Sequence, residues 1–211
     1  MGRRDNKGGN KSKAMKYMIH ASLEIDGSVQ RKDVIGAIMG QTVSVLGVIP
    51  DHISAVLERL RAAGNDITIS TDSVTIKRGK RIRPVDVTTS VYPGFPTDVQ
   101  AQWMTLMALA DGNSTIVDTI YRDRFTHVSE LSRLGAEIKR KDNTVRVFGT
   151  GKLIGAPVMA TDLRASVSLV LAGLAARDET MVNRVYHLDR GYERIEEKLA
   201  AVGADIERVP E

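Results

Sequence analysis

The sequence predicts an α/β protein made of repeated β-α-β-α-β-β units, and three observations lead to this fold class. Thr-Asp pairs at 97–98 and 161–162 open two apolar helical stretches, at an offset of 162 − 98 = 64 residues. Each stretch is followed by a polar turn and a β-rich run. Three amphipathic helices then each end at a glycine that precedes a strand. Self-similarity of this kind is typical of a fold assembled from one repeated unit.

The composition is that of a globular chain with enough apolar material for a core. Hydrophobic residues make up 42% of the 211 residues and charged residues 27%, which is too little charge bias for a wholly disordered chain. The length fits one substantial domain or two small ones. Because cysteine is absent, disulfides, thiolate metal sites and a cysteine nucleophile are excluded from these residues.

Basic residues are concentrated at the amino terminus. The chain has 30 Lys and Arg against 26 Asp and Glu, a net charge of +4. We expect residues 1–15 to form a basic disordered leader, with a nucleic-acid-binding arm as the alternative. Aromatic residues are only 4% of the chain and leave few platforms for stacking bases, so we do not expect nucleic acid as a partner.

No targeting or membrane-spanning segment is predicted. No apolar run reaches the roughly 18 residues of a spanning helix, and no hydrophobic region follows the basic amino terminus. We therefore expect neither membrane insertion nor secretion, and a cytoplasmic location.

The earliest copy of the repeat begins with an amphipathic helix whose apolar residues include Ile53, Leu57 and Leu60. Gly64 follows at the position where a helix end favours a residue with positive φ. A strand near Ile67 comes next, and residues 73–76 predict its return strand in a short hairpin.

The second and third copies place an apolar helix, over 103–110 and 166–175, before this pattern. The β-rich runs 115–117 and 180–182 follow those helices, and the later helices end at Gly135 and Gly203. We expect the apolar helices of different units to meet in a common interior. The residues predicted to face it are Leu106, Leu109, Leu169, Val170, Leu171 and Leu174.

Five long segments carry a specific family likeness. They are 48–52 (VIPDH), 92–102 (YPGFPTDVQAQ), 124–128 (RFTHV), 156–166 (APVMATDLRAS) and 186–196 (YHLDRGYERIE). On these segments, residues from about 42 to 211 resemble the carboxyl-terminal part of the UDP-N-acetylglucosamine enolpyruvyltransferase family. The resemblance implies an inside-out α/β barrel with two lobes of three repeated units each, of which residues 42–211 correspond to one lobe.

The resemblance also implies a reaction. The family adds the 3′-hydroxyl of UDP-N-acetylglucosamine to C2 of phosphoenolpyruvate and then eliminates phosphate, in peptidoglycan precursor synthesis. This chemistry needs a base for the hydroxyl, a proton source for the methylene carbon, and cations for the carboxylate and phosphate. The resemblance implies that Asp98 is the base and that Asp162 belongs to the proton-transfer network.

The remaining site residues implied by the resemblance bind substrate. Arg164 and Arg190 correspond to residues that hold the carboxylate end of phosphoenolpyruvate, a task that suits the planar fork of arginine. Ile120 and Tyr121 match positions near the nucleotide sugar.

Ordinary structural roles compete with these assignments. Thr-Asp before an apolar helix is typical of an N-cap, and a helix N-terminus lowers the basicity of a carboxylate. Position rather than a raised pKa would therefore have to make Asp98 a base. A structural ion pair is the alternative role for Arg164 and Arg190.

The histidines lack the spacing of metal ligands. His52, His127 and His187 occur singly, so we expect structural or peripheral places for them. We expect no metal and no cofactor.

The family's other lobe has no counterpart in these 211 residues. The resemblance implies that this other lobe supplies a lysine, an asparagine, further arginines and a mobile loop with the acid group. It also implies that the active site lies between the lobes. We therefore expect the single lobe to be inactive or weakly active by itself, with a partner chain as one source of the missing lobe.

Residues 16–41 resemble a different family, the start of the archaeal DnaG-type primase. The matching segments are 16–27 (KYMIHASLEIDG) and 33–42 (DVIGAIMGQT), and they exclude that family's catalytic acidic cluster. Their own pattern predicts a strand and a short apolar helix that begins near Asp33. These elements either complete the first repeat or form a loosely attached segment.

Three functions are compatible with these observations. The leading hypothesis is an isolated or truncated enolpyruvyltransferase lobe that acts on UDP-N-acetylglucosamine and phosphoenolpyruvate. The first alternative is a non-catalytic nucleotide-sugar-binding or assembly module. The second is a nucleic-acid-associated protein that uses its amino-terminal segment.

Overall fold

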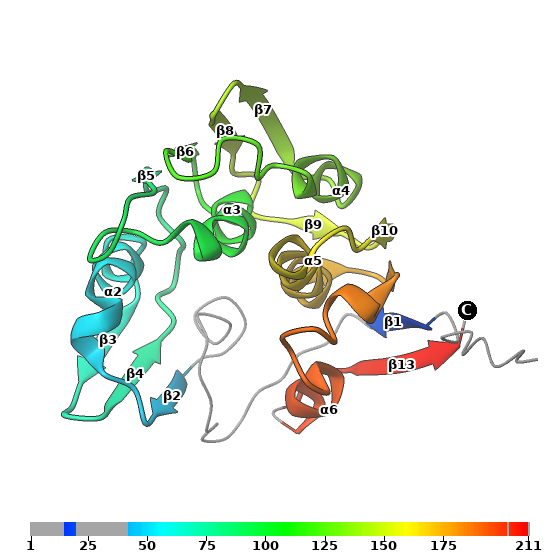
Figure 1. The fold of residues 1–211 in the computed structure, drawn as a ribbon, viewed down its shortest axis with the longest axis horizontal. Helices are drawn as coiled ribbons and strands as arrows, with labels where there is room; N and C mark the ends of the chain where they lie inside the picture. The colour runs from blue at the N-terminus through cyan, green and yellow to red at the C-terminus, as the bar shows by residue number, and fades with distance from the viewer. Residues whose placement is uncertain (1–14, 20–41, 202, 211) are drawn as a thin grey trace, which may run out of the picture.

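A computed structural model of the chain describes residues 15–19, 42–201 and 203–210. Among the described residues, three sheets of three or four strands and one two-stranded pair lie around two buried helices, with further helices beside the sheets (Figure 1). The α/β fold class and the repeated units predicted from the sequence are both present.

The first unit is a three-stranded antiparallel sheet with one helix. Strand β2 (Thr42–Leu46) pairs with β4 (Ser73–Lys77), and β4 pairs with β3 (Asp66–Ile69). The short helix η1 (Pro50–Ile53) and the helix α2 (Ser54–Ala62) follow β2. Helix α2 buries Leu57 and Leu60 because its apolar residues share one face, and Gly64 with φ +98° ends it as predicted.

The second unit contains every element of the predicted repeat. Its sheet has the order β5-β6-β8-β7, parallel between β5 and β6 and antiparallel elsewhere. The elements in chain order are β5 (Val87–Thr88), η2 (Thr97–Val99), α3 (Gln100–Ala108), β6 (Asn113–Val117), α4 (His127–Arg133), β7 (Glu137–Lys141) and β8 (Thr144–Phe148).

The third unit has the sheet order β10-β12-β1-β13. Its elements in chain order are β10 (Pro157–Met159), α5 (Leu163–Ala175), β12 (Thr180–Asn183), η3 (Val185–His187), α6 (Ile195–Ala200) and β13 (Ile206–Pro210). A small parallel pair, β9 (Leu153–Ile154) with β11 (Ala176–Arg177), joins the second and third units.

Strand β1 (Met15–Ile19) comes from the other end of the chain. It pairs antiparallel with both β12 and β13, so it takes the place in the third sheet that β8 takes in the second. We expected the strand in residues 16–41 either to complete the first unit or to belong to a loosely attached segment; the strand that is described pairs in the last unit instead. The helix predicted from Asp33 lies outside the described residues.

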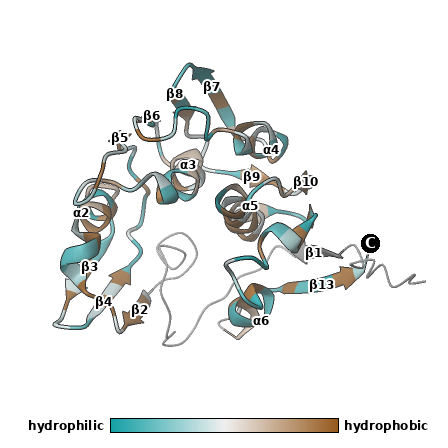
Figure 2. Cartoon of the chain, viewed as in Figure 1, coloured by the Kyte–Doolittle hydropathy of each residue, from teal (hydrophilic) through white to brown (hydrophobic). Residues whose placement is uncertain are grey.

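The core is built around α3 and α5. All nine residues of α3 are buried, and so are residues 165–174 of α5; Figure 2 shows α5 largely in apolar colours and α3 in mixed ones. The predicted interior is confirmed, with five of its six leucine and valine residues buried and Leu109 partly buried. A buried hydrogen bond from Thr105 Oγ1 to the Ser168 carbonyl, at 3.2 Å, links the two helices.

His127 is buried at the start of α4. Its side chain is 1% exposed, and neither ring nitrogen has a hydrogen-bond partner among the described residues. Burial, opposed only in part by the charge of Asp162, lowers the pKa of His127 from its usual 6.5 to about 4. The imidazole is therefore neutral at pH 7, which agrees with the structural place expected for it.

Two kinds of feature are not found in the described part of the chain. No helix there is long and apolar enough to cross a membrane. No group of three or more histidine, cysteine, aspartate or glutamate side chains there is arranged to hold a metal ion.

The α3–α5 packing predicts a large effect of truncating Leu106, which is fully buried. Leu106→Ala is expected to lower the free energy of unfolding by about 2–5 kcal/mol, because it removes apolar contacts and leaves a cavity. Urea denaturation measures this change. The exposed Arg133→Ala is the control and is expected to stay within about 0.5 kcal/mol of wild type. Equal stabilities of the two variants would show that α3 is not a core helix.

The buried His127 predicts that acid lowers stability. The pKa of His127 is about 4 in the folded protein and 6.5 in the unfolded chain. The stability that the neutral ring contributes is therefore fully present above pH 6.5 and is lost as the pH falls toward 4. Between pH 7 and pH 5 this one group contributes a loss of about 2 kcal/mol. Urea denaturation at both pH values, in wild type and in His127→Phe, measures it. A variant that loses as much stability as wild type over this interval would show that His127 is not the cause.

Candidate active site

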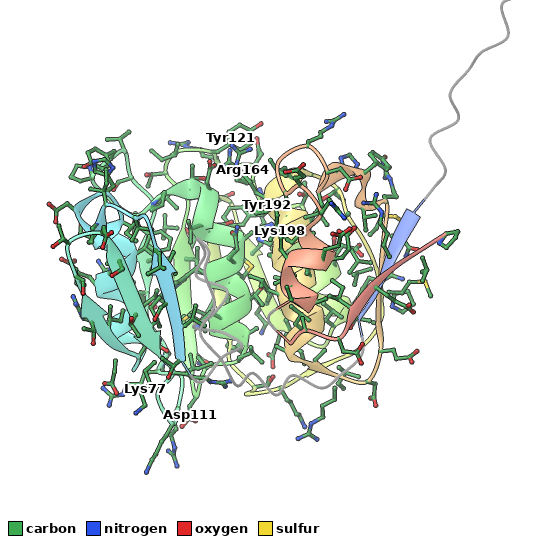
Figure 3. All side chains as sticks on the ribbon, turned by 90° about the horizontal axis from the view of Figure 1, so that it is seen from below. Lys77, Asp111, Tyr121, Arg164, Tyr192 and Lys198 are labelled. Carbon is green, nitrogen blue, oxygen red and sulfur yellow. The ribbon has the colours of Figure 1, made fainter. Side chains whose placement is uncertain are left out.

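The amino-terminal ends of α3 and α5 carry most of the polar residues that the sequence singled out. Thr97 and Asp98 lie in η2, directly before α3, and Asp162 and Arg164 lie at the start of α5. Figure 3 shows Arg164, Tyr121 and Tyr192 at one end of the molecule, with Lys77 and Asp111 at the other. We call the first end the site end.

Asp98 is shared by two arginines. Arg164 Nε lies 2.5 Å from Asp98 Oδ1, and Arg164 Nη2 donates to Oδ2 at 3.1 Å. Arg124 Nη1 donates to Oδ1 at 2.6 Å. The two-pronged contact from Arg164 uses the fork geometry that favours arginine over lysine as a carboxylate partner. Since Asp98 and Arg124 belong to the second unit and Arg164 to the third, the carboxylate joins two units.

Asp98 does not cap a helix through its side chain. Neither η2 nor α3 has a side-chain cap hydrogen bond, so the N-cap role weighed for Asp98 is wrong. Burial opposes its ionisation, but hydrogen bonds from Arg164 and Arg124 outweigh burial and hold the pKa of Asp98 below its usual value. The low basicity that we expected therefore has a different cause: two guanidinium groups rather than a helix terminus.

Asp162 is the residue that caps a helix. Its Oδ1 accepts hydrogen bonds from the backbone nitrogens of Arg164 at 2.9 Å and Ala165 at 3.0 Å. Its Oδ2 accepts one from Thr126 Oγ1 at 3.1 Å. These bonds satisfy free N–H groups at the start of α5 and fix the backbone from which the Arg164 side chain extends. Its role in proton transfer stays a prediction.

Asp118 was missed by the sequence analysis, and it organises the site. Its side chain is fully buried just after β6. It accepts hydrogen bonds from Thr89 Oγ1 at 2.8 Å, Thr97 Oγ1 at 2.6 Å, and the backbone nitrogens of Ile120 at 3.0 Å and Tyr121 at 2.8 Å. Burial raises the pKa of this carboxyl, but these hydrogen bonds outweigh burial and leave the pKa below its usual value.

The hydrogen bonds of Asp118 connect three segments of the site. Thr97 Oγ1, which donates to Asp118, also accepts from Arg124 Nη1 at 3.1 Å. The buried carboxylate is thus linked to the Asp98 segment, to Arg124 and to the turn at 120–121. An aspartate at the end of a β-rich run was visible in the sequence, but its threonine partners lie 21 and 29 residues away and are found only through the fold.

Ile120 and Tyr121 are both exposed, and Tyr121 lies beside Arg124. Their side chains are 44% and 56% exposed, and Arg124 Cζ lies 5.0 Å from the centroid of the Tyr121 ring, within the range of a cation–π contact. An exposed aliphatic and an exposed aromatic side chain next to a cation form a surface that suits an amphipathic ligand.

Arg190 does not join the other predicted residues by direct contact. It is exposed in the turn after η3 and makes no hydrogen bond or ion pair among the described residues. Burial, Arg184 and Arg190 lower the pKa of the neighbouring His187, while Asp162 raises it. The structure therefore brings Asp98, Asp162 and Arg164 together and leaves Arg190 at the edge.

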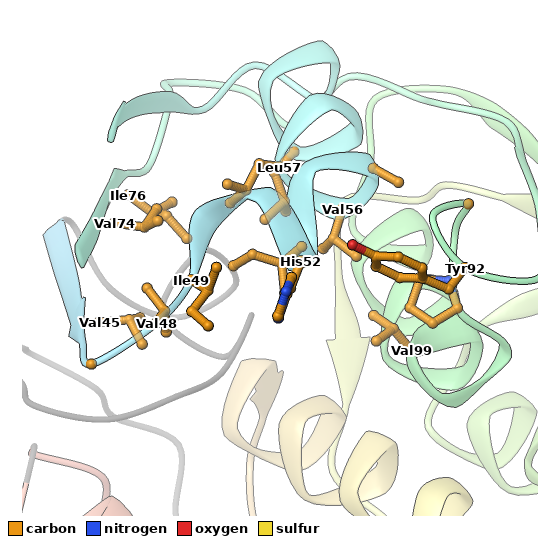
Figure 4. A pocket seen from close by; sticks show the side chains of 16 residues that line it. Val45, Val48, Ile49, His52, Val56, Leu57, Val74, Ile76, Tyr92 and Val99 are labelled. Atoms are coloured by element: carbon orange, nitrogen blue, oxygen red, sulfur yellow. The ribbon is translucent and has the colours of Figure 1, made fainter. Parts of the chain in front are cut away.

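An apolar cavity of about 490 Å³ lies on the first-unit side of this cluster (Figure 4). Its walls come from β2, β4, α2 and the loop before η2, and include Val45, Ile76, Leu57 and Val99. His52 and Tyr92 also line it, and their rings make an edge contact with centroids 6.1 Å apart. Because none of the described residues that line it is an aspartate, glutamate, lysine or arginine, we assign it no part in binding a charged substrate.

Sequence comparisons identify relatives of the chain. The profile of the family described as EPSP synthase (3-phosphoshikimate 1-carboxyvinyltransferase) matches residues 9–199. A UDP-N-acetylglucosamine 1-carboxyvinyltransferase from Chlorobaculum parvum is 55% identical over 172 residues, which are 82% of this chain and 41% of that protein. The enzyme of the same name from Xanthobacter autotrophicus is 56% identical over 174 residues, with the same coverage. The chain spans about two-fifths of these relatives.

Solved structures show the same fold. The enolpyruvyl transferase NikO from Streptomyces tendae has a TM-score of 0.76 at 29% identity, over 84% of this chain and 42% of that chain. EPSP synthase from Acinetobacter baumannii has a TM-score of 0.67 at 18% identity, over 84% and 45% of the two chains, and shows the fold alone. None of these findings supports the primase resemblance of residues 16–41, which stays a prediction.

The family match and the arrangement of the units agree. Helices α3 and α5 are buried between sheets of the same strand order, which is the arrangement expected for one lobe of an inside-out α/β barrel. The match covers more than half of the chain. The chain belongs to the EPSP synthase family of enolpyruvyl transferases.

Proposed function

We propose that the site end of this chain forms one wall of an enolpyruvyl-transfer site that takes UDP-N-acetylglucosamine and phosphoenolpyruvate. The observation that carries the proposal is the Asp98 carboxylate held between Arg124 and Arg164. The names of relatives at 55–56% identity support the choice of substrates. The reaction belongs to peptidoglycan precursor synthesis.

The guanidinium groups would bind the anionic substrate. The side chain of Arg164 is 40% exposed, and that of its partner Asp98 is 54% exposed, so an incoming carboxylate can reach the guanidinium group. Phosphoenolpyruvate would compete with Asp98 for Arg164, because the two carboxylates offer the same acceptor geometry. Arg190, exposed nearby, would add a second cation to the bound anion.

Substrate binding would also change Asp98. The hydrogen bonds from Arg164 and Arg124 are what lower its pKa. Once an anionic substrate engages Arg164, this stabilisation weakens and the carboxylate becomes a better proton acceptor. Asp98 would then accept the proton of the sugar hydroxyl, and Asp162, held at the start of α5, would lie beside the bound anion. Ile120 and Tyr121 would contact the nucleotide sugar.

We propose that these 211 residues alone bind substrate but turn it over weakly or not at all. The cations Arg124 and Arg164 both belong to this one lobe and contact a substrate from one side only. Water is therefore not excluded from the reacting groups. A partner chain carrying the other lobe would complete the site. The chain's span of two-fifths of its relatives also favours a second candidate function, a nucleotide-sugar-binding module without turnover.

Calorimetric titration with phosphoenolpyruvate, in the presence of UDP-N-acetylglucosamine, tests the proposed anion contact. Arg164→Ala is expected to weaken binding by about tenfold or more, because a charge-assisted pair of hydrogen bonds is lost. Asp98→Asn is expected to bind as tightly as wild type or more tightly, because it removes the competitor for Arg164. Arg133→Ala, an exposed arginine of α4 away from the cluster, is the control.

The outcomes of this titration separate the functions. Weaker binding by Arg164→Ala together with unchanged or tighter binding by Asp98→Asn supports the proposed site. Equal affinities in wild type and Arg164→Ala would contradict it. Phosphate release measured in the same samples tests whether the site is incomplete. Steady release by the chain alone would overturn the proposal of an incomplete site. Binding of the sugar with no release, even after addition of the other lobe of a relative, would favour the binding module.

A further inference from the structure

A strongly basic loop lies at the end of the molecule opposite the site end. Residues 77–83, which connect β4 to the segment before β5, contain five exposed cations in seven positions. They are Lys77, Arg78, Lys80, Arg81 and Arg83. We call this segment the basic loop. Figure 3 shows Lys77 and Asp111 at the end of the molecule opposite Tyr121 and Arg164.

The basic loop is fixed to the body of the protein. Ile82 is 5% exposed and anchors it in the core. The backbone nitrogen of Arg83 donates to the Ala63 carbonyl at 2.9 Å, and the Ile82 carbonyl accepts from the backbone nitrogen of Asp111 at 2.8 Å. A Cβ added at Gly79 would collide with the Gly64 carbonyl oxygen, so the two backbones are in close contact. The cations are therefore carried by a defined backbone.

Three of these cations line one cavity of about 440 Å³. Lys80, Arg81 and Arg83 form its charged wall, with Gly64, Pro84 and Asp111. Arg81 is paired with Asp111 at 3.3 Å, but both side chains are more than two-thirds exposed, so water screens the pair. The side chains of Lys80 and Arg83 make no hydrogen bond or ion pair within the described part of the chain.

Helix dipoles do not account for this excess of charge. The basic loop lies at the carboxyl-terminal end of α2, where cations are favoured, but α2 already has Arg59 and Arg61 in its last turn. Further cations close together repel one another unless an anion lies between them. The described residues of the lining include no aromatic or large apolar side chain, which disfavours a nucleobase or another flat apolar ligand.

We propose that this cavity binds a compact anion with several charges, of the diphosphate class, through Lys80, Arg81 and Arg83. The two cations without a partner would contact the anion first, and Arg81 would turn from Asp111 to the bound oxygens. Asp111 would act against binding. This anion site is separate from the proposed enolpyruvyl-transfer site and does not depend on it.

Titration with inorganic pyrophosphate, followed by the amide NMR signals of the full chain at constant ionic strength, tests the proposal. Saturable shifts are expected at Gly64 and Gly79. The double variant Lys80→Ala/Arg83→Ala is expected to weaken these shifts by about tenfold or more in dissociation constant. Asp111→Asn is expected to tighten binding. Arg133→Ala/Lys141→Ala removes the same charge from exposed positions elsewhere and is expected to match wild type.

The readout distinguishes this site from the site end. Binding of pyrophosphate near Arg164 would shift the amides of Ile120 and Tyr121, which are recorded in the same spectra. Shifts at 120–121 without shifts at Gly64 and Gly79 would overturn the proposal while leaving the proposed function intact. Equal weakening in the double variant and its charge-matched control would also overturn it, because general attraction would then explain the binding. Weaker binding by Asp111→Asn would contradict the assigned role of that carboxylate.

Discussion

The packing of α3 against α5 is the constraint on which the candidate site depends. Both helices are buried along almost their whole length and are joined by the hydrogen bond from Thr105 to the Ser168 carbonyl. Their amino-terminal ends are consequently held together, which brings Asp98 within reach of Arg164, 66 residues later in the chain. Two residues that neighbour each other only through the core thus form an ion pair on the surface.

The site is electrostatically balanced before any substrate arrives. Asp98 neutralises charge on Arg124 and Arg164, while Asp118 and Asp162 are occupied by hydroxyl and backbone donors. These three carboxylates therefore differ in their partners: Asp118 and Asp162 accept hydrogen bonds from hydroxyl and backbone groups, and Asp98 is both exposed and bound by arginines that an anion can engage. In the proposed reaction, an anion that displaced Asp98 from Arg164 would raise the pKa of this carboxylate and so allow it to accept a proton.

The sequence predicted what depends on local pattern. Apolar spacing located α3 and α5, and glycines at 64, 135 and 203 marked helix ends, all with positive φ. Local pattern could not predict long-range strand pairing. The place of β1 between β12 and β13 is set by register with strands more than 160 residues away. The role of Asp118 and the partners of Asp98 likewise depend on contacts between segments. A Thr-Asp pair before a helix looks the same whether the aspartate caps the helix, as Asp162 does, or binds two arginines.

Direct titration of the Asp98 carboxyl carbon by NMR is the measurement closest to the central claim. If Asp98 is held by guanidinium groups brought to it by the α3–α5 packing, its pKa lies below the usual aspartate value in wild type. Replacing Arg164 with alanine then raises that pKa, whereas replacing Arg133 does not change it. A pKa at the usual value that is unaffected by loss of Arg164 would contradict the account, because the carboxylate would then be independent of the third unit.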